Sequence, residues 1–310
     1  AGDLTCDCVS GELYPHQPLA EQGNIDAQMM LGALYFDGDI IPQDSKASAK
    51  WFEQAAMQGN ADAQYILGNL YVHGEGVQRS LSKAFEWFYL AAKEGRPDGE
   101  YQRSLAAMYL NGWGVTRDLM AAYKWYSLAA EKEHPKAQFQ LGEILRSGVG
   151  VPQDNIIAIT WYTRAAEQGH TVAQYKLGLI YATGEGVPED TNAAFKWLLY
   201  SAEKGYVEAQ YLLGLLYGID GDSQNHKSSL KWYTQAAEQG HVESQFNLGV
   251  IYANGTGVPQ DYVLSHMWFN IATSNGKPPT LRDLATQSMT PSQIEEAETL
   301  ARKWMEKPFK

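Results

Sequence analysis

The sequence has few cysteines, few basic residues and no long hydrophobic run. Its two cysteines, Cys6 and Cys8, are separated by a single residue, so a bridge between them would close a strained ring. They lack Cys-x-x-Cys spacing, and a metal fragment would need further ligands, so we expect free or externally paired thiols, which do not identify a compartment. No apolar run approaches the length of a membrane span. With 24 basic and 36 acidic residues, the net charge of −12 argues against binding nucleic acid.

Glycine, Trp and Tyr are abundant instead, at 29, 9 and 19 residues among 310, and their spacing is periodic. Seven of the tryptophans recur at steps of 35 to 38 residues. They are Trp51, Trp87, Trp125, Trp161, Trp197, Trp232 and Trp268. Glycines follow the same period, after a leucine, in Gly-x-Gly pairs and at the end of each unit. A fixed period of this length is the signature of a repeat protein.

The unit at 170–205 shows how one repeat folds. Its first segment spaces Ala173, Leu177 and Tyr181 four residues apart, which predicts a helix. The glycine- and proline-containing stretch 184–188 ends that helix, and Asp190 is placed to cap a second one. The second segment has the same helical spacing, so each unit reads as helix, loop, helix and turn.

Such a unit cannot bury its apolar face alone, so the units must stack. We therefore predict an all-α fold, a right-handed α/α superhelical solenoid of about seven helix-turn-helix repeats. The expected repeats are 24–59, 60–95, 96–133, 134–169, 170–205, 206–240 and 241–276. Some repeats depart from the pattern: repeat three has Ala106 and Glu133 at glycine positions, and repeats one and six lack the paired glycines. These departures are either neutral drift in surface loops or loops that project differently.

The run Ala173-Gln174-Tyr175-Lys176-Leu177-Gly178, followed by the loop at 184–188 and Trp197, resembles a Sel1-like repeat, a relative of the tetratricopeptide repeat. The resemblance covers residues 24–276. It implies a solenoid without catalytic activity that binds other proteins, and many bacterial members are exported.

The ends of the array are expected to differ from its middle. The motif Thr290-Pro291-Ser292-Gln293 predicts a capping box, and the segment 277–310 a C-terminal capping helix at 291–306. Alternatively, Trp304 and Met305 engage a partner. Residues 1–23 are a leader, either the remnant of an earlier repeat or an irregular cap, because prolines at positions 15 and 18 forbid a long helix. They contain no signal peptide.

No catalytic motif stands out from the repeat. The Gly-x-Gly-Val loops follow helices and lack the Lys-Ser/Thr pair of a phosphate-binding loop. His134, His170 and His241 occur once per repeat, too far apart to share a metal ion, so we read them as turn residues before first helices. The sequence therefore predicts no enzyme, no cofactor and no metal site.

The first helix of each repeat has a second face, which by resemblance to tetratricopeptide arrays lines a concave groove. Aromatic residues and arginine, the commonest interface anchors, recur there two residues before the leucine. This ladder consists of Met29, Tyr65, Arg103, Phe139, Tyr175, Tyr211 and Phe246. Neighbouring candidates for partner binding are Asn69, His73, Glu143, Arg146, Leu179 and Leu215, near Asp62, Glu100 and Lys136. If the ladder lines the groove, Tyr175→Ala and Tyr211→Ala should weaken partner binding and leave the thermal midpoint nearly unchanged. Alternatively, the ladder packs against adjacent repeats, in which case both changes would lower that midpoint.

The sequence thus predicts a protein-protein interaction scaffold, a monomer, whose groove holds a partner peptide or domain. The resemblance implies a secreted or periplasmic bacterial protein. One version is a host-facing virulence or host-cell-entry adaptor; the alternative is a periplasmic regulator or assembly factor of a larger complex.

Overall fold

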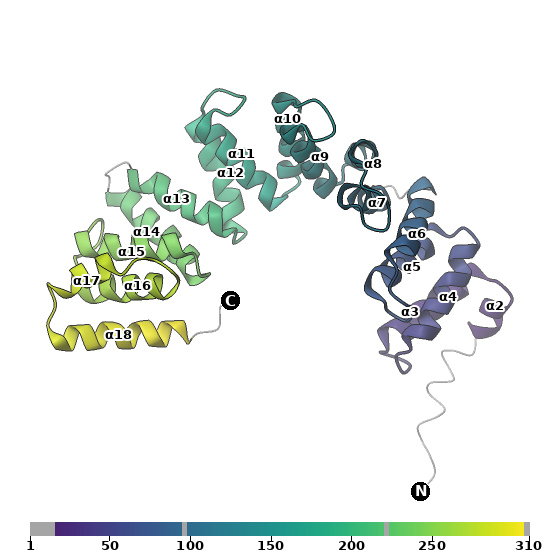
Figure 1. Ribbon diagram of the computed structural model, residues 1–310, viewed down its shortest axis with the longest axis horizontal. Helices are drawn as coiled ribbons and strands as arrows, with labels where there is room; N and C mark the ends of the chain where they lie inside the picture. Colours follow the sequence, from purple (N-terminus) through teal and green to yellow (C-terminus); the bar gives the residue numbers. More distant parts are fainter. Residues whose placement is uncertain (1–15, 95–97, 220–222, 307–310) are drawn as a thin grey trace, which may run out of the picture. The chain divides into compact units, whose positions relative to one another are not determined.

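A computed structural model describes residues 16–94, 98–219 and 223–306 (Figure 1). These residues form seventeen helices and no strand. The first fifteen residues of the leader, with Cys6 and Cys8, and the loop at 220–222 of repeat six lie outside the described residues. The chain divides after Ala165 into two compact units.

The helices follow one another in pairs, which confirms the predicted helix-turn-helix units. In the first unit they are α2 (Gln17–Glu21), α3 (Ile25–Asp37), α4 (Ser45–Met57), α5 (Ala61–His73), α6 (Leu81–Glu94), α7 (Glu100–Asn111), α8 (Leu119–Glu131), α9 (Pro135–Ser147) and α10 (Asn155–Glu167), whose end enters the second unit. The second unit contains α11 (Thr171–Thr183), α12 (Thr191–Glu203), α13 (Val207–Ile219), α14 (Ser223–Glu238), α15 (Val242–Asn254), α16 (Tyr262–Ser274), α17 (Thr280–Thr286) and α18 (Pro291–Met305).

Side-chain caps start most of these helices. Asp190 accepts a hydrogen bond from the amide of Ala193, as the sequence predicted for the second helix. Five of the first helices are capped by Asn24, by Asn60 or by a histidine. The three predicted turn histidines are these caps: His134, His170 and His241 accept through Nδ1 from the amides of Ala137, Ala173 and Ser244.

Within a pair, a glycine brings the two helices close together. A Cβ atom at Gly68 on α5 would lie 2.7 Å from the ring of Phe88 on α6. The residue that fills this contact, Phe88, is the one directly after the repeat tryptophan Trp87. Glycines 32, 142, 178, 214 and 249 have the same relationship to a bulky residue of the second helix.

Between repeats, a buried glutamine fastens each first helix to the helix before it. Gln64 on α5 donates through Nε2 to the carbonyl oxygen of Ala56 on α4, at 3.1 Å. The remaining members of this series are Gln28 to Ala20, Gln102 to Ala92, Gln138 to Ala130, Gln174 to Ala166, Gln210 to Ala202 and Gln245 to Ala237. The loop also touches the preceding repeat, because a Cβ at Gly76, whose φ is +69°, would overlap the Ser45 carbonyl.

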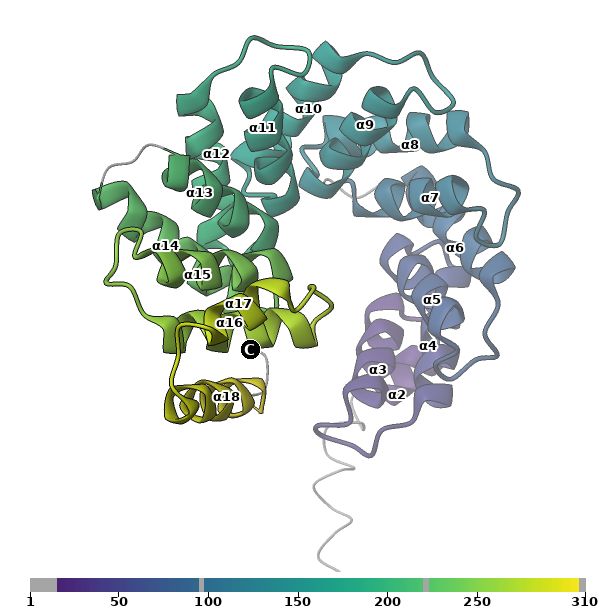
Figure 2. The same cartoon turned by 60° about the vertical axis from the view of Figure 1, so that its left-hand side comes forward.

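At each end of the described chain, a helix outside the seven repeats packs against the terminal repeat. The short helix α2 supplies Ala20, 1% exposed, to the first Gln contact. Helix α18 begins with the predicted capping box of Thr290 and Gln293 and lies beside α16 (Figures 1 and 2). There the ring of Trp304 meets Trp268 edge-on at 5.4 Å between centroids.

Candidate functional site

The predicted ladder lies on the first helices α3, α5, α7, α9, α11, α13 and α15, and all seven members are half-buried. We call the side of these helices that carries the ladder the first-helix face. Five of the six other predicted residues are also half-buried, namely Asn69, Glu143, Arg146, Leu179 and Leu215, and His73 is exposed. On this face, therefore, part of each of these side chains is exposed to solvent and the rest is packed against neighbouring residues.

Tyr65 shows what these rings contact. Its ring stacks on Tyr101 of the next repeat at 4.8 Å and tilts against Phe88 of its own second helix at 5.3 Å. Each of the other aromatic members contacts a ring of its own second helix, a ring at the start of the next repeat, or both. The pairs are Phe139 with Tyr162, Tyr175 with Tyr206, Tyr211 with Tyr233 and His241, and Phe246 with Phe269.

These contacts make the ladder part of the packing between helices. Tyr175 and Tyr211 both lie against buried clusters of the second unit. An alanine at either position would therefore remove packing as well as any binding contact, so an unchanged thermal midpoint is no longer expected for these two variants.

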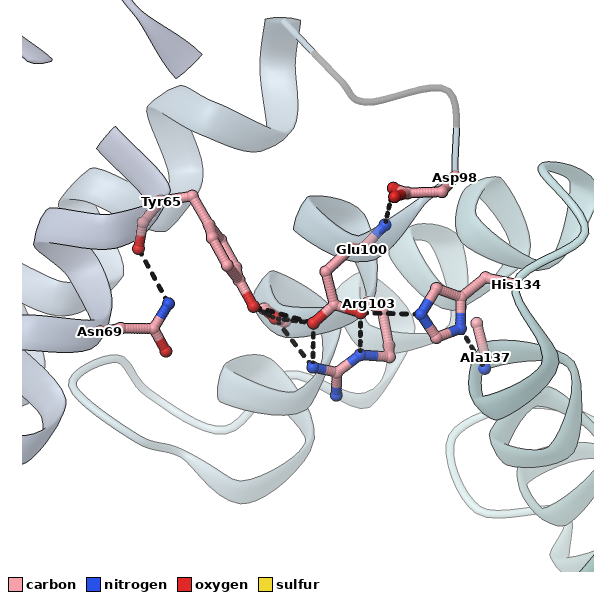
Figure 3. Close-up of polar contacts among 8 residues, drawn as sticks. Tyr65, Asn69, Asp98, Glu100, Arg103, His134 and Ala137 are labelled. Carbon is pink, nitrogen blue, oxygen red and sulfur yellow. Dashed lines mark hydrogen bonds and ion pairs between the residues drawn. The ribbon is translucent and has the colours of Figure 1, made fainter. Parts of the chain in front are cut away.

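In repeat three the ladder member is Arg103, and its guanidinium is held by Glu100 (Figure 3). Arg103 donates from Nη2 to Glu100 Oε1 at 2.6 Å and from Nε to Oε2 at 3.0 Å. Tyr65 donates its hydroxyl to Oε1 at 2.8 Å, and Nε2 of His134 lies 2.7 Å from Oε2. Figure 3 shows these groups converging from α5, from α7 and from the start of α9. This cluster joins three successive repeats of the first unit.

The electrostatics of this cluster favour an ionised Glu100. Burial alone would raise the pKa of Glu100, but the hydrogen bonds from His134 and Arg103 outweigh it and hold that pKa far below its usual range. An ionised Glu100 accepts a hydrogen bond from the Nε2–H group of His134, which leaves Nδ1 free to accept from the Ala137 amide and cap α9. Arg103 is thus partly neutralised within the chain.

In repeats two and four, three of the predicted residues bond within their own repeat. Asn69 donates to the Tyr65 carbonyl oxygen at 3.0 Å. Glu143 accepts from the Tyr162 hydroxyl at 2.5 Å, and Arg146 lies 3.8 Å from Glu143. Burial, and then the hydrogen bond to Glu143, raise the pKa of Tyr162, so this phenol stays protonated.

Sequence reasoning missed a recurring partner of the ladder, the residue that begins the next repeat. In repeat seven this residue is Lys277, whose ammonium lies 2.6 Å from Glu243 and 5.3 Å from the centroid of Phe246. His134 and His241 hold the equivalent position beside Arg103 and Tyr211. In repeats three and seven a glutamate, Glu100 or Glu243, comes three residues before the ladder member. Aligning the repeats and comparing this position with the one that begins the next repeat would have revealed the pairing of the glutamate with a histidine or lysine.

The described residues hold no group of three or more His, Cys, Asp or Glu that could bind a metal ion. No described helix combines the length and the hydrophobicity needed to span a bilayer. What the first-helix face does offer is aromatic edges beside carboxylates, an arrangement suited to binding a polypeptide.

Comparisons with known proteins bear on the whole array. The Sel1 repeat family model matches residues 25–60, 61–95, 99–134, 135–170, 171–206, 207–241 and 242–277. A Sel1 repeat protein from Oxalobacter formigenes is 33% identical with a TM-score of 0.73, over 91% of this chain and 81% of that one. A protective antigen of uropathogenic Escherichia coli is 31% identical with a TM-score of 0.69, over 98% of this chain and 73% of that one. No curated protein matches. Together these matches confirm the predicted all-α solenoid of seven helix-turn-helix repeats.

Proposed function

The chain belongs to the Sel1 repeat family, and from that premise we propose that it is a non-enzymatic scaffold that holds a partner protein on its first-helix face. Sel1 repeat proteins generally mediate protein-protein interaction and are generally non-catalytic. The observation that carries the proposal is the ladder, which places a half-exposed aromatic or arginine side chain on six of the seven first helices. Rigid aromatic edges supply contact area at a low entropic cost.

The partner's segment lies along this face as a peptide or as part of a domain, and the array acts as a monomer without nucleic acid. We propose a secreted or periplasmic location. A host-facing adaptor, in virulence or in host-cell entry, is favoured by the similarity to the protective antigen of uropathogenic E. coli. The second candidate, a periplasmic regulator or assembly factor, is favoured by the scaffold geometry alone. Cell fractionation that finds the protein outside the envelope supports the first candidate, and retention in the periplasm supports the second.

A matched pair of asparagine variants tests the binding face. Asn69 is half-buried on the first-helix face of α5, whereas Asn192 is exposed near the start of the second helix α12. Asn69→Arg and Asn192→Arg make the same chemical change on different surfaces. Once affinity capture has identified a partner and the purified proteins bind each other, N69R should weaken that binding at least about tenfold by steric and charge conflict.

N192R should bind within about twofold of the unmodified chain. Circular dichroism and thermal melts of both variants confirm that the arrays are intact. Equal affinities of N69R and the unmodified chain, or a loss confined to N192R, would place the partner elsewhere and contradict the proposal.

A further inference from the structure

Repeat seven shows how the first-helix face binds a cation. The Lys277 ammonium, contributed by the turn after α16, lies 2.6 Å from a carboxylate oxygen of Glu243 and above the ring of Phe246. Glu243 is in the first turn of α15, and Phe246 is the ladder member three residues later. The cation therefore gains an ion pair and a cation–π contact together. In this repeat the chain supplies the cation itself.

Repeat six repeats the arrangement without an ammonium group. Glu208, in the first turn of α13, precedes the ladder member Tyr211 by three residues, as Glu243 precedes Phe246. The position of Lys277 is taken by His241, whose ring lies 4.6 Å from the ring of Tyr211. Glu208 is exposed, and its carboxylate makes no hydrogen bond or ion pair with any described residue. It is thus a carboxylate in the equivalent place with no cation on it.

Two further rings lie within reach of the charge of Glu208. Tyr206, directly before α13, lies against the ladder member Tyr175 of repeat five at 4.9 Å. Burial raises the pKa of both phenols, and the negative charge of Glu208 raises both further, so its charge acts on the two rings. Burial lowers the pKa of His241, which is therefore mostly neutral at pH 7 and leaves the charge of Glu208 uncompensated.

We propose that repeats five and six bind a lysine or arginine side chain of the partner, held by the Glu208 carboxylate beside the rings of Tyr175 and Tyr206. The inference rests on the proposed function and specifies the chemistry of the partner, which is a basic polypeptide segment. Charge complementarity supports it, because the chain carries a net charge of −12. In repeat seven the equivalent carboxylate, Glu243, does hold an ammonium group, that of Lys277.

The experiment measures binding of a short fluorescent peptide with two arginines among Gly and Ser, and of the same peptide with both arginines replaced by Gln. The full chain is compared with Glu208→Gln, and with Glu203→Gln as a control that removes one exposed carboxylate from α12, a second helix. We expect the arginine peptide to bind and the Gln peptide not to bind. E208Q should weaken binding about fivefold and E203Q by less than twofold, as expected for an exposed ion pair with a cation–π contact.

Lys277→Met supplies an independent readout, because it vacates the equivalent site in repeat seven. We expect this variant to bind additional arginine peptide, as a second site or a steeper titration. Equal affinities of E208Q and E203Q, or a K277M chain that titrates like the unmodified chain, would overturn the inference.

A failure of this inference differs from a failure of the proposed function. If the purified partner loses affinity for N69R and binds E208Q normally, the face stands and the cationic anchor is wrong. If N69R and E208Q both bind the partner normally while the peptide distinguishes E208Q from E203Q, the site takes cations and the proposed binding face is wrong.

Discussion

The ammonium of Lys277 lies 2.6 Å from the carboxylate of Glu243, and this contact ties the last first helix to the segment that follows the seventh repeat. The same position relative to the ladder is held by His134, which lies beside repeat three, and by His241, which lies beside Tyr211 of repeat six. At this position the two histidines have two roles, because each caps the first helix of its own repeat and also contacts the preceding repeat. The charge on each histidine affects helix capping and the first-helix face together.

We predict that His241→Asn makes the array less sensitive to acid. His241 caps α15 through an unprotonated Nδ1, which a proton would remove as an acceptor. Burial lowers its folded-state pKa below the unfolded value of 6.5, although the charges of Glu208 and Glu243 oppose this. Its contribution is therefore fully present above pH 6.5 and is lost as the pH falls toward and through the depressed folded-state pKa.

Urea unfolding at pH 7 and pH 5 measures this effect. Asparagine caps α5 at Asn60, so the variant keeps a neutral acceptor at both pH values. His73→Asn, at an exposed histidine that caps no N-terminus, is the control and should follow the unmodified chain. An identical loss of stability in H241N and the unmodified chain would exclude His241 as a source of acid sensitivity.

Glu133→Gly should stabilise the first unit. Among described residues, Glu133 is the one non-glycine with a positive φ, at 61°, and it stands where other repeats close with glycine. A left-handed backbone conformation costs a residue with a side chain about 1–2 kcal/mol. Glycine removes this strain, but its more flexible unfolded chain loses more entropy on folding, which offsets part of the gain. We expect a gain of about 0.5–1 kcal/mol in the free energy of unfolding.

The reverse change at the equivalent turn is the matched control. Gly59 has a φ of +88°, and a Cβ there would meet nothing within 4 Å, so Gly59→Ala isolates backbone strain. It should cost about 1 kcal/mol. A destabilised E133G would mean that the Glu133 side chain contributes more than its strained backbone costs.

Trp304→Ala should loosen α18 from the array. Trp304 is half-buried against Trp268, which is only 6% exposed, and truncation removes an aromatic pair and its buried area. We expect a loss of about 2–3 kcal/mol. Hydrogen exchange should show faster exchange in α18 and at the end of α16. Met305→Ala, at a more exposed neighbour, should leave exchange nearly unchanged; equal effects of both variants would contradict the contact.

Tyr211→Ala should lower Tm by several degrees, the result expected if the ladder packs between helices. Its ring contacts Tyr233 and His241, so truncation leaves a gap between helices. Tyr211→Phe keeps the ring and should melt within about a degree of the unmodified chain. Differential scanning calorimetry measures both, and an unaltered Tm for Y211A would show that the ring is dispensable for packing.

The fold was predictable because the same helix-forming, capping and turn residues recur at the same positions of each repeat. Helical spacing, capping residues such as Asp190 and left-handed glycines fix where helices begin and end, and the period then requires stacking. The glutamine contact of Gln64 with Ala56 was not predicted, because it depends on which carbonyl the next helix meets. The seven-fold recurrence of that residue pair was the available signal.

The candidate site was only partly predictable for the same reason. The ladder follows from spacing within one helix, so Tyr65 and Tyr211 could be placed on one face. Their contacts with the following repeat depend on register between repeats, which hydrophobic periodicity does not encode. Lys277 was missed because it comes after the last predicted repeat, although it occupies the position that His241 holds one repeat earlier.

The most direct test of the first-helix face is site-specific photo-crosslinking of the full chain to its purified partner. A benzophenone amino acid replaces Leu215, half-buried on the face of α13, or Lys196, exposed on the second helix α12. Both positions lie in the second unit, so both probes report on one body. The account predicts a strong crosslink from position 215 that excess unlabelled chain competes away, and only background from position 196. Crosslinking from position 196 without crosslinking from position 215 would contradict it.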